Sequence, residues 1–385
     1  MNIKTKTKKS ISPNQAKVNS PTAKSYITNT GEILVDKTKK GKDKKWAKKK
    51  SQSLHVADIF AKAREQNEEV ISASALDNIR HCSEVLTFKV QTETGERTLN
   101  EIYTCKSKFC PICASRRSTL LRNQTMKVVD KILEEDPTTR FIFLTLTTEN
   151  VPGSDIGKEV DHFVKSLQRI FSKGNGAIKE SAKLRSSVLG TMRHIEVTYS
   201  IQRDDYHVHA HVIIAVKDSY FSSENYLTQK DYQELWKKAA KLDYNPIVHV
   251  KAIHGKGKVL ESAVAETAKY ATKMSNILCL PEDKAVEVLS YMQVGLFNRR
   301  LVGHTGTFYK LRRELKLEDI ETADLLKIDD EEEEKGGTFE YHVFRWSFSL
   351  KEYICLPHQV VKSLDEEYFR EKRREKILKI YGLAG

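Results

Sequence analysis

The sequence of 385 residues lacks any apolar run close to the roughly 20 residues that a membrane-spanning helix needs. It also has no apolar segment behind its first lysines, so we expect no secretory signal. Hydrophobic residues make up 39% of the chain and charged residues 30%, which predicts a soluble protein with a substantial core. These absences argue against membrane and secreted classes, and we expect a cytoplasmic protein.

Acidic residues are scarce in the first 50 positions, where three acids face 15 lysines. This segment therefore carries a net +12 of the chain's formal charge of +13. A polar, lysine-rich segment buries too little apolar surface to fold alone, so we expect residues 1–52 to form a disordered basic tail. Such a tail either solubilises the chain or binds a polyanion, and we favour the second role. Trp46, which lies among these lysines, is a candidate for stacking on a base.

Cysteine is also scarce, with six residues, but four of them form a pattern. Cys82 precedes a cluster in which Cys105, Cys110 and Cys113 follow the spacing C-x4-C-x2-C. In a cytosolic chain, clustered cysteines favour metal binding over disulfides. Four thiolates complete a tetrahedral structural zinc site, so we predict a zinc-ribbon-like module here. The alternative is four cysteines without a ligand.

Three histidines alternate with small or aliphatic residues at His207, His209 and His211. Successive side chains of a strand point to opposite faces, so these imidazoles would share one face. A row of imidazoles suits a divalent metal ion, whereas the plainer interpretation is a solvated strand face. We favour the metal site.

Periodicity predicts an alternating order of strands and helices around this stretch. We expect strands over 141–148, 190–200, 206–217 and 247–250, and helices over 54–79, 117–133, 156–171, 228–241 and 258–278. From residue 141 the order is β-α-β-β-α-β-α. Its first six elements match the split βαβ, ferredoxin-like pattern, an α+β fold with helices on an antiparallel sheet.

A polar turn at residues 203–205 separates the second and third strands of that pattern. In an antiparallel hairpin with this turn, Glu196 would lie opposite residues 209–211. Glu196 is then either a carboxylate ligand beside the histidines or the partner in a cross-strand salt bridge. Both interpretations remain open.

The helix expected over 258–278 carries a second candidate group. Glu266, Tyr270 and Lys273 fall on a polar face of that helix, and Lys269 also flanks the tyrosine. Nearby lysines favour the phenolate and attract a phosphate, which suits a nucleophile. A tyrosine on an ordinary amphipathic surface is the alternative. A metal site in the same chain favours phosphoryl transfer.

Taken together, several blocks resemble the rolling-circle replication initiators of small bacterial plasmids, members of the HUH endonuclease superfamily. They are Phe143-Leu-Thr-Leu-Thr147, Glu196-Val-Thr-Tyr199 with the histidine strand, Glu266-x-x-Lys269-Tyr270-x-x-Lys273, the cysteine cluster with Arg116-Arg117, and Arg299-Arg300-Leu with Gly306-x-Phe308. The resemblance covers about residues 78–315.

The resemblance implies roles for individual residues. His209 and His211 would be metal ligands, and Tyr270 would attack a scissile DNA phosphate to leave a 5′-phosphotyrosine and a free 3′-OH. Glu266 would activate water for the terminating cleavage. The family pattern has no counterpart for His207, which would ligate the metal, replace Glu196 as a ligand, or contact DNA.

The expected cofactors are a catalytic Mg²⁺ or Mn²⁺ and a structural Zn²⁺. Lys269 and Lys273 would offset charge on the phosphate. The expected partners are plasmid origin DNA, as a nick site and a duplex binding site, a host helicase, and a second copy of the chain. The rival functions are a non-catalytic zinc-containing DNA-binding regulator of replication, and a relaxase or transposase of the same superfamily.

The same analysis divides the chain into five segments. They are the basic tail 1–52, a helical and zinc-ribbon-like module 53–136, an HUH endonuclease domain 137–315, an acidic linker 316–337, and a C-terminal part 338–385 with a strand over 339–348 and a basic helix over 362–380.

Overall fold

The computed structural model describes most of the chain as two compact units. The described residues are 31–38, 41–172, 174, 176–253, 257–269, 274–326, 328 and 338–356. The smaller unit comprises Met1–Lys48, Ser83–Tyr103 and Glu332–Gly385, and the larger unit comprises Lys49–Cys82 and Thr104–Glu331. Four expected features lie outside the described residues, namely the start of the basic tail, the end of the acidic linker (residues 329–337), the helix over 362–380, and Tyr270 with Lys273.

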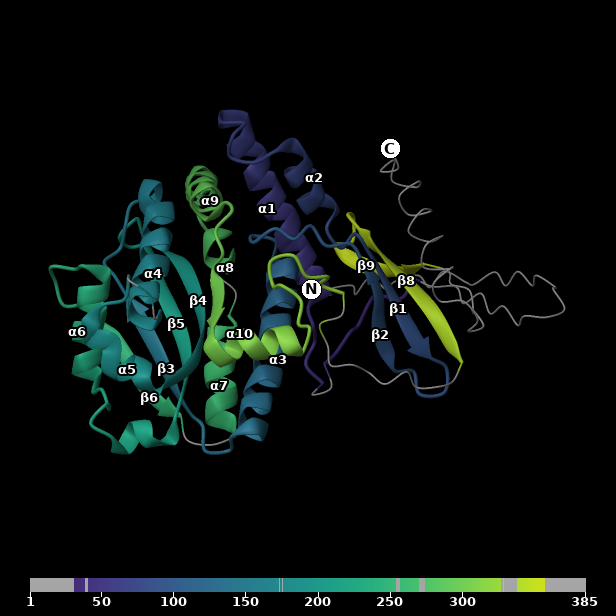
Figure 1. Cartoon of the computed structure of the whole chain (residues 1–385). Coiled ribbons are helices and arrows are strands. Elements are labelled where there is room, and N and C mark those ends of the chain that lie inside the picture. The colour runs from purple at the N-terminus through teal and green to yellow at the C-terminus, as the bar shows by residue number, and fades with distance from the viewer. Residues whose placement is uncertain are drawn as a thin grey trace, which may run out of the picture. The chain divides into compact units, whose positions relative to one another are not determined.

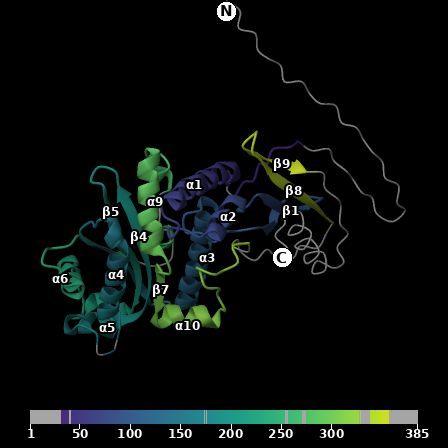
Figure 2. The same ribbon diagram turned by 90° about the horizontal axis from the view of Figure 1, so that it is seen from above.

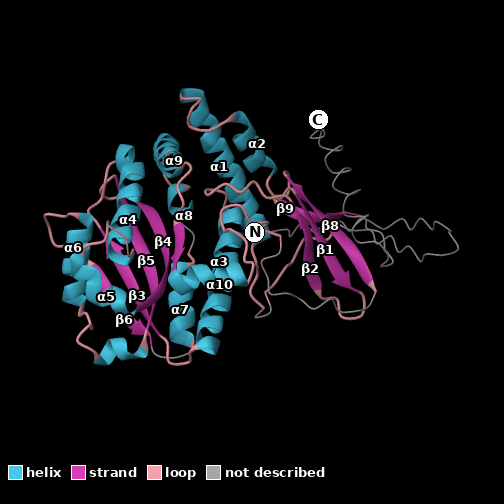
Figure 3. Cartoon of the chain, in the orientation of Figure 1, coloured by secondary structure: helices cyan, strands magenta, loops and turns pink. Residues whose placement is uncertain are grey.

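The smaller unit is built on a four-stranded antiparallel sheet (Figure 3). Its order is β2-β1-β8-β9, with bounds Arg97–Ile102, Val85–Gln91, Phe339–Ser347 and Glu352–Leu356. The strand predicted over 339–348 is β8. Gly95, at φ +70°, makes the turn between β1 and β2, where the left-handed conformation suits glycine. Buried Phe88 and Phe344 meet edge to face with ring centres 5.7 Å apart, so aromatic packing joins β1 to β8.

The basic segment is more ordered near its end than the sequence predicts. Ile33 forms a β-bridge with Ile354, and helix α1 begins at Trp46, so a disordered tail reaching residue 52 is wrong. Trp46 is buried, and its indole N–H donates to the Asp36 carboxylate over 2.8 Å. Stacking of this ring on a base is therefore also wrong, because the indole belongs to the core.

Two helices replace the single helix expected over 54–79. They are α1, Trp46–Gln66, and α2, Ala73–His81. The hydroxyl of Ser72 accepts a hydrogen bond from a backbone N–H of the following turn, which starts a new helix at that point. Val70-Ile71 in the connection are buried, so the apolar pattern continues across the break. Periodicity alone therefore does not reveal two helices.

The larger unit is organised around a five-stranded antiparallel sheet in the order β6-β3-β5-β4-β7. The bounds are β3 Arg140–Thr147, β4 Val188–Ser200, β5 Asp205–Val216, β6 Val248–Ile253 and β7 Val302–Thr305. Strands β3 and β4 each pair antiparallel with β5, which lies between them, so they run parallel to one another. Four of these strands are predicted from the sequence, whereas the four-residue β7 is not.

Helices α4 and α6 cover one face of this sheet (Figures 1 and 2). Helix α4, Ile156–Phe171, connects β3 to β4, and α6, Gln229–Ala240, connects β5 to β6. Phe163 and Trp236 from these helices pack with ring centres 5.1 Å apart in the core that also buries Val208, Ala210 and Val212 of β5. Short turns of helix lie nearby, namely η1 Gly153–Asp155, η2 Lys179–Ser181, α5 Ala182–Ser187 and η3 Asp218–Ser222. The histidines of β5 therefore face the opposite side of the sheet.

Helix α7, which contacts β5, is shorter than expected. The helix predicted over 258–278 is wrong, because α7 ends at Thr267 and a separate α8 spans only Met274–Ile277. The bounds of α7 are Lys258–Thr267, and the larger unit also contains α3 Pro111–Glu135, α9 Glu282–Leu296 and α10 Gly306–Glu314. Among all the helices in the described ranges, none has the length and apolarity to cross a bilayer.

Candidate functional site

The four clustered cysteines meet in the larger unit. The sulfur of Cys82 lies 3.6 Å from the sulfurs of Cys110 and Cys113, and the sulfur of Cys105 lies 3.6 Å from that of Cys113. These separations are far longer than a disulfide bond. A tetrahedron with metal–sulfur bonds of about 2.3 Å has sulfur–sulfur edges of about 3.8 Å. The four thiols therefore fit a single tetrahedral metal ion.

Local structure favours one thiolate at this cluster, at Cys110. This residue is the N-cap of α3, where the positive end of the helix stabilises negative charge. Burial acts to raise the pKa of Cys110, but hydrogen bonds from the other three thiols outweigh it, and the pKa falls well below its usual range. The hydrogen bond with Cys110 in turn raises the pKa of Cys105. One cysteine of the cluster thus ionises readily. Four thiolates this close together would repel one another unless a cation lay between them.

Lys50 holds the backbone next to the cluster and is missed by sequence reasoning. Its ammonium group is fully buried and donates to the carbonyls of Arg80 and Cys82, over 2.7 and 2.8 Å. It therefore fixes Cys82, the ligand most distant in sequence, against α1. In the sequence Lys50 is one of many lysines in a basic run, so no local signal marks it.

The histidine strand pairs with β4 in the predicted register. Glu196 lies directly opposite His209, and His194 lies opposite His211. On the other side, β3 places Thr145 opposite His211. The antiparallel pairing thus puts one carboxylate and two imidazoles on a single face of the sheet, opposite to the α4 and α6 layer.

Glu196, His209 and His211 form a second group that could hold a metal ion. The Nε2 atom of His209 lies 3.3 Å from one oxygen of Glu196, and that of His211 lies 4.0 Å from the other. Glu196 is 8% exposed and His211 7%. The Oε1 atom of Glu196 and the Nδ1 atom of His209 are buried without a hydrogen-bond partner among the described residues. Such atoms are costly to bury unless a ligand binds them.

The electrostatics keep this group ready for a cation. Burial acts to raise the pKa of Glu196, but the hydrogen bond from His209 and the nearby imidazoles outweigh it, so the pKa is lowered and the carboxylate stays ionised. Burial also lowers the pKa of His211, which keeps its imidazole neutral. An ionised carboxylate beside neutral imidazole is the protonation state that metal ligation requires.

His207 points to a different partner. Its Nδ1 atom lies 2.9 Å from the side-chain oxygen of Asn150, and its ring stacks on that of His209 with centres 5.1 Å apart. At this second site, the ligand atoms that converge come from Glu196, His209 and His211, without His207. The structure therefore brings together three of the four residues that the sequence suggests as ligands of the divalent cation.

Two residues of β3 support His211, and both lie in the Phe143-Leu-Thr-Leu-Thr147 block of the resemblance, which assigns them no role. The hydroxyl of Thr145 lies 3.1 Å from Nδ1 of His211, which orients the ring. Phe143 stacks on the same imidazole with ring centres 5.4 Å apart. Both residues belong to a strand of ordinary β-rich composition, so only the pairing of β3 with β5 shows their role.

The end of α7 lies near this group. The backbone carbonyl of Thr267, the last residue of α7, lies 2.8 Å from Nδ1 of His194, which is opposite His211 in the sheet. The ammonium group of Lys269 donates to the Glu266 carboxylate, and both side chains are partly exposed. The candidate residues Tyr270 and Lys273 follow directly and lie outside the described residues.

A family model described as "Replication protein" matches residues 96–354, a range that includes Cys105, Cys110 and Cys113 of the cysteine cluster and the whole histidine strand. The chain therefore belongs to the Rep_1 family of replication proteins, and the resemblance noted in the sequence is confirmed.

Individual relatives agree with this assignment. A protein named "Protein rep" from Streptococcus pneumoniae serotype 2 is 34% identical over 313 residues, covering 80% of this chain and 92% of its own length. One of the same name from Lentilactobacillus hilgardii is 33% identical over 328 residues, covering 84% and 98%. A "Replication protein" from Staphylococcus aureus is 34% identical over 236 residues, covering 60% and 97%. No solved structure matches the chain significantly.

Proposed function

We propose that this protein starts rolling-circle replication of a plasmid by nicking one strand of its origin, and later rejoins the strand ends. The observation that carries the proposal is the group Glu196, His209 and His211, on strands that contact α7, the helix that leads into Tyr270. A chain of the replication protein family with this group and this tyrosine has the parts of a phosphoryl-transfer site. The order β6-β3-β5-β4 supports a ferredoxin-like sheet as the platform for the site.

Glu196, His209 and His211 would hold a divalent cation, Mn²⁺ or Mg²⁺. Their donor set of one carboxylate and two imidazoles suits Mn²⁺ and accepts Mg²⁺, and the two buried atoms without partners support a ligand there. When bound, the ion would polarise the scissile phosphate. Thr145 orients the imidazole of His211 and Phe143 packs against it, so the chain itself fixes the direction of that ligand.

Tyr270 would be the nucleophile. Its phenolic oxygen would bond to the phosphorus while the bond from phosphorus to the 3′ oxygen breaks. The phenolic proton passes to the 3′ oxygen, which leaves a 5′-phosphotyrosine and a free 3′-OH. Lys269 and Lys273 flank the tyrosine in sequence and would offset charge on the phosphate.

Glu266 would act at the end of replication. Its carboxylate is partly exposed and paired with Lys269, so water can reach it. We propose that water is the nucleophile of the terminating cleavage, where a second tyrosine would otherwise act. Glu266 would accept a proton from this water. This role follows the family pattern at Glu266-x-x-Lys269-Tyr270.

The four cysteines would hold a structural Zn²⁺. The sulfur–sulfur separations of 3.6 Å match the edges of a zinc tetrahedron, and all four positions are occupied by protein. A metal site of this kind stabilises the fold and leaves no coordination position open for a reactant. It would fix the start of α3 against α1 and the loop after residue 104.

Origin DNA is the proposed partner, as a single-stranded or hairpin nick site beside a duplex binding site, in the cytoplasm. A basic start to the chain supports DNA contact. A host helicase and a second copy of the chain are the further partners we propose from the resemblance. A relaxase function fits less well, because relaxases usually place the tyrosine before the histidines.

The Tyr270→Phe variant tests the proposal against a non-catalytic DNA-binding regulator. Purified wild-type protein should convert supercoiled origin plasmid to the open circle with Mn²⁺, and the variant should not. Nicking by the variant at the wild-type rate would remove Tyr270 from the mechanism. A wild-type protein that binds its origin without nicking it would favour the regulator.

A further inference from the structure

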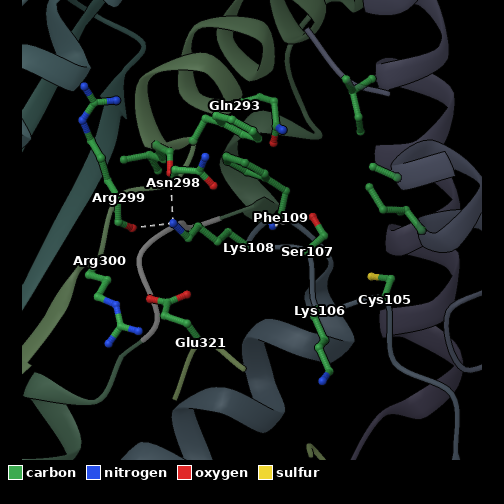
Figure 4. Close-up of a pocket in the computed structure, with 15 residues that line it drawn as sticks. Cys105, Lys106, Ser107, Lys108, Phe109, Gln293, Asn298, Arg299, Arg300 and Glu321 are labelled. Atoms are coloured by element: carbon green, nitrogen blue, oxygen red, sulfur yellow. Dashed lines mark hydrogen bonds between the residues drawn. The ribbon is translucent and has the colours of Figure 1, made fainter. Parts of the chain in front are cut away.

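The larger unit contains a pocket of about 370 Å³ that the nicking reaction leaves unused. Its walls come from three places, namely α2, the loop after Cys105, and the end of α9 with residues 297–300 (Figure 4). The volume lies at the lower end of the range for small-ligand sites, which begins at about 300 Å³. It is therefore large enough for one nucleobase.

Two free amides line one wall of the pocket. Gln293 comes from the last turns of α9 and Asn298 follows that helix (Figure 4). Neither side chain has a hydrogen-bond partner among the described residues, although each offers both donors and an acceptor. Paired amide donors and acceptors match the edges of nucleobases.

Apolar surface accompanies these amides. Ile79, Phe109 and Leu296 are buried and line the pocket interior. Phe297 lines it too, but 63% of its surface is exposed, which is high for a phenylalanine. An exposed ring at a pocket mouth is a platform on which a base can stack.

The charged residues of the pocket are mostly basic, and their side chains make different contacts. Lys108 donates to the carbonyls of Leu296 and Arg299, over 2.9 and 2.6 Å, so it holds the end of α9 in place. The Arg299 guanidinium binds both oxygens of Asp161. Among the described residues Arg300 pairs with Asp319 alone, over 2.7 Å, and its side chain is 68% exposed. A surface ion pair of this kind is weak, so Arg300 can exchange its partner for a phosphate.

We propose that this pocket holds one unstacked base of single-stranded DNA. The ring of Phe297 stacks on the base, the amides of Gln293 and Asn298 bind its edge, and Arg300 contacts the adjoining phosphate. This inference rests on the proposed function only in that the chain binds DNA, since none of these residues takes part in strand cleavage. It identifies a substrate contact outside the histidine strand.

Phe297→Ala tests the stacking, with Val294→Ala as the matched control. Val294 lies one turn earlier in α9, is 57% exposed and does not line the pocket. The probe is a fluorescein-labelled single-stranded oligonucleotide of mixed sequence, titrated at one fixed salt concentration. Loss of one stacked base should weaken binding about fivefold or more in the Phe297 variant and less than about twofold in the control. Equal affinities for the two variants would overturn the proposal.

A cross-link separates this inference from the cleavage chemistry. An oligonucleotide carrying 5-iododeoxyuridine should cross-link on irradiation to the peptide that contains Phe297, in the wild type and in Tyr270→Phe alike. Cross-links confined to the other peptides would contradict the pocket even if the wild type nicks DNA. A cross-link at Phe297 in a protein that never nicks would uphold the pocket and reject the proposed catalysis.

Discussion

The Nδ1 atom of His194 lies 2.8 Å from the backbone carbonyl of Thr267, the last residue of α7. His194 is fully buried on β4, two residues before Glu196, and burial lowers its pKa to about 4. The imidazole is therefore neutral at neutral pH and donates its Nδ1–H to that carbonyl. This hydrogen bond joins the strand that carries Glu196 to the end of the helix that leads into Tyr270.

Removing this link should impair cleavage more than binding. His194→Ala should slow nicking about tenfold or more, because small displacements of a nucleophile are costly. The affinity for the oligonucleotide should stay within about twofold. His194→Asn should recover part of the rate, since its amide can replace the lost donor. An alanine variant that nicks normally would show that the link does not position the nucleophile.

Glu196→Gln should weaken Mn²⁺ binding at least about tenfold, because the amide cannot supply the ionised oxygen that the two imidazoles face. Titration calorimetry on the whole protein measures this directly. His207→Gln is the matched comparison on the same face of β5, and it should change the affinity less than about threefold. If the His207 variant loses more affinity than the Glu196 variant, the third ligand is His207.

Glu266→Ala should separate initiation from termination. Nicking of supercoiled plasmid should stay within about threefold of the wild type, whereas release of monomeric circles should fall at least about tenfold, as expected for loss of a general base. Glu261→Ala, in the first turn of the same helix, is the control and should affect neither step. Normal release of circles by the Glu266 variant would remove the proposed role.

Cys113→Ser should abolish zinc binding and destabilise the larger unit. The wild type should contain one zinc per chain by mass spectrometry, and the variant close to none. Loss of a structural zinc should lower the melting temperature by about 10 °C or more. Cys279→Ser, at an exposed cysteine outside the cluster, should retain both zinc and melting temperature. A variant that keeps its zinc would show that the cluster serves another purpose.

The sequence predicts those parts of the site whose residues lie close together in the chain. The spacing of His209 and His211 and the turn near residue 204 are enough to place Glu196, because an antiparallel hairpin has a fixed register. Cys105, Cys110 and Cys113 are likewise predicted by their spacing, whereas Cys82 joins them from 23 residues earlier in the chain. The side chains that support these residues are different, since Lys50 and Thr145 gain their roles only from contacts with distant segments.

The limits of prediction in the fold have a similar origin. The apolar pattern of 54–79 runs through a buried connection, so periodicity continues a single helix where α1 ends at Gln66 and Ser72 starts α2. In the smaller unit, β1 pairs with β8, which lies some 250 residues further along the chain. Local propensity does not encode such pairing. The five expected segments and the two compact units therefore divide the chain differently. Apart from the end of the basic tail, the five-segment division stays a prediction.

The central claim is that Tyr270 forms a covalent bond to origin DNA. The most direct measurement is to trap the reaction of wild-type protein with single-stranded origin DNA and Mn²⁺, digest it, and locate the nucleotide by mass spectrometry. We predict a 5′-phosphotyrosine on the peptide that contains Tyr270, and no adduct in Tyr270→Phe or Glu196→Gln. An adduct on a different tyrosine, or cleavage without any adduct, would contradict the account.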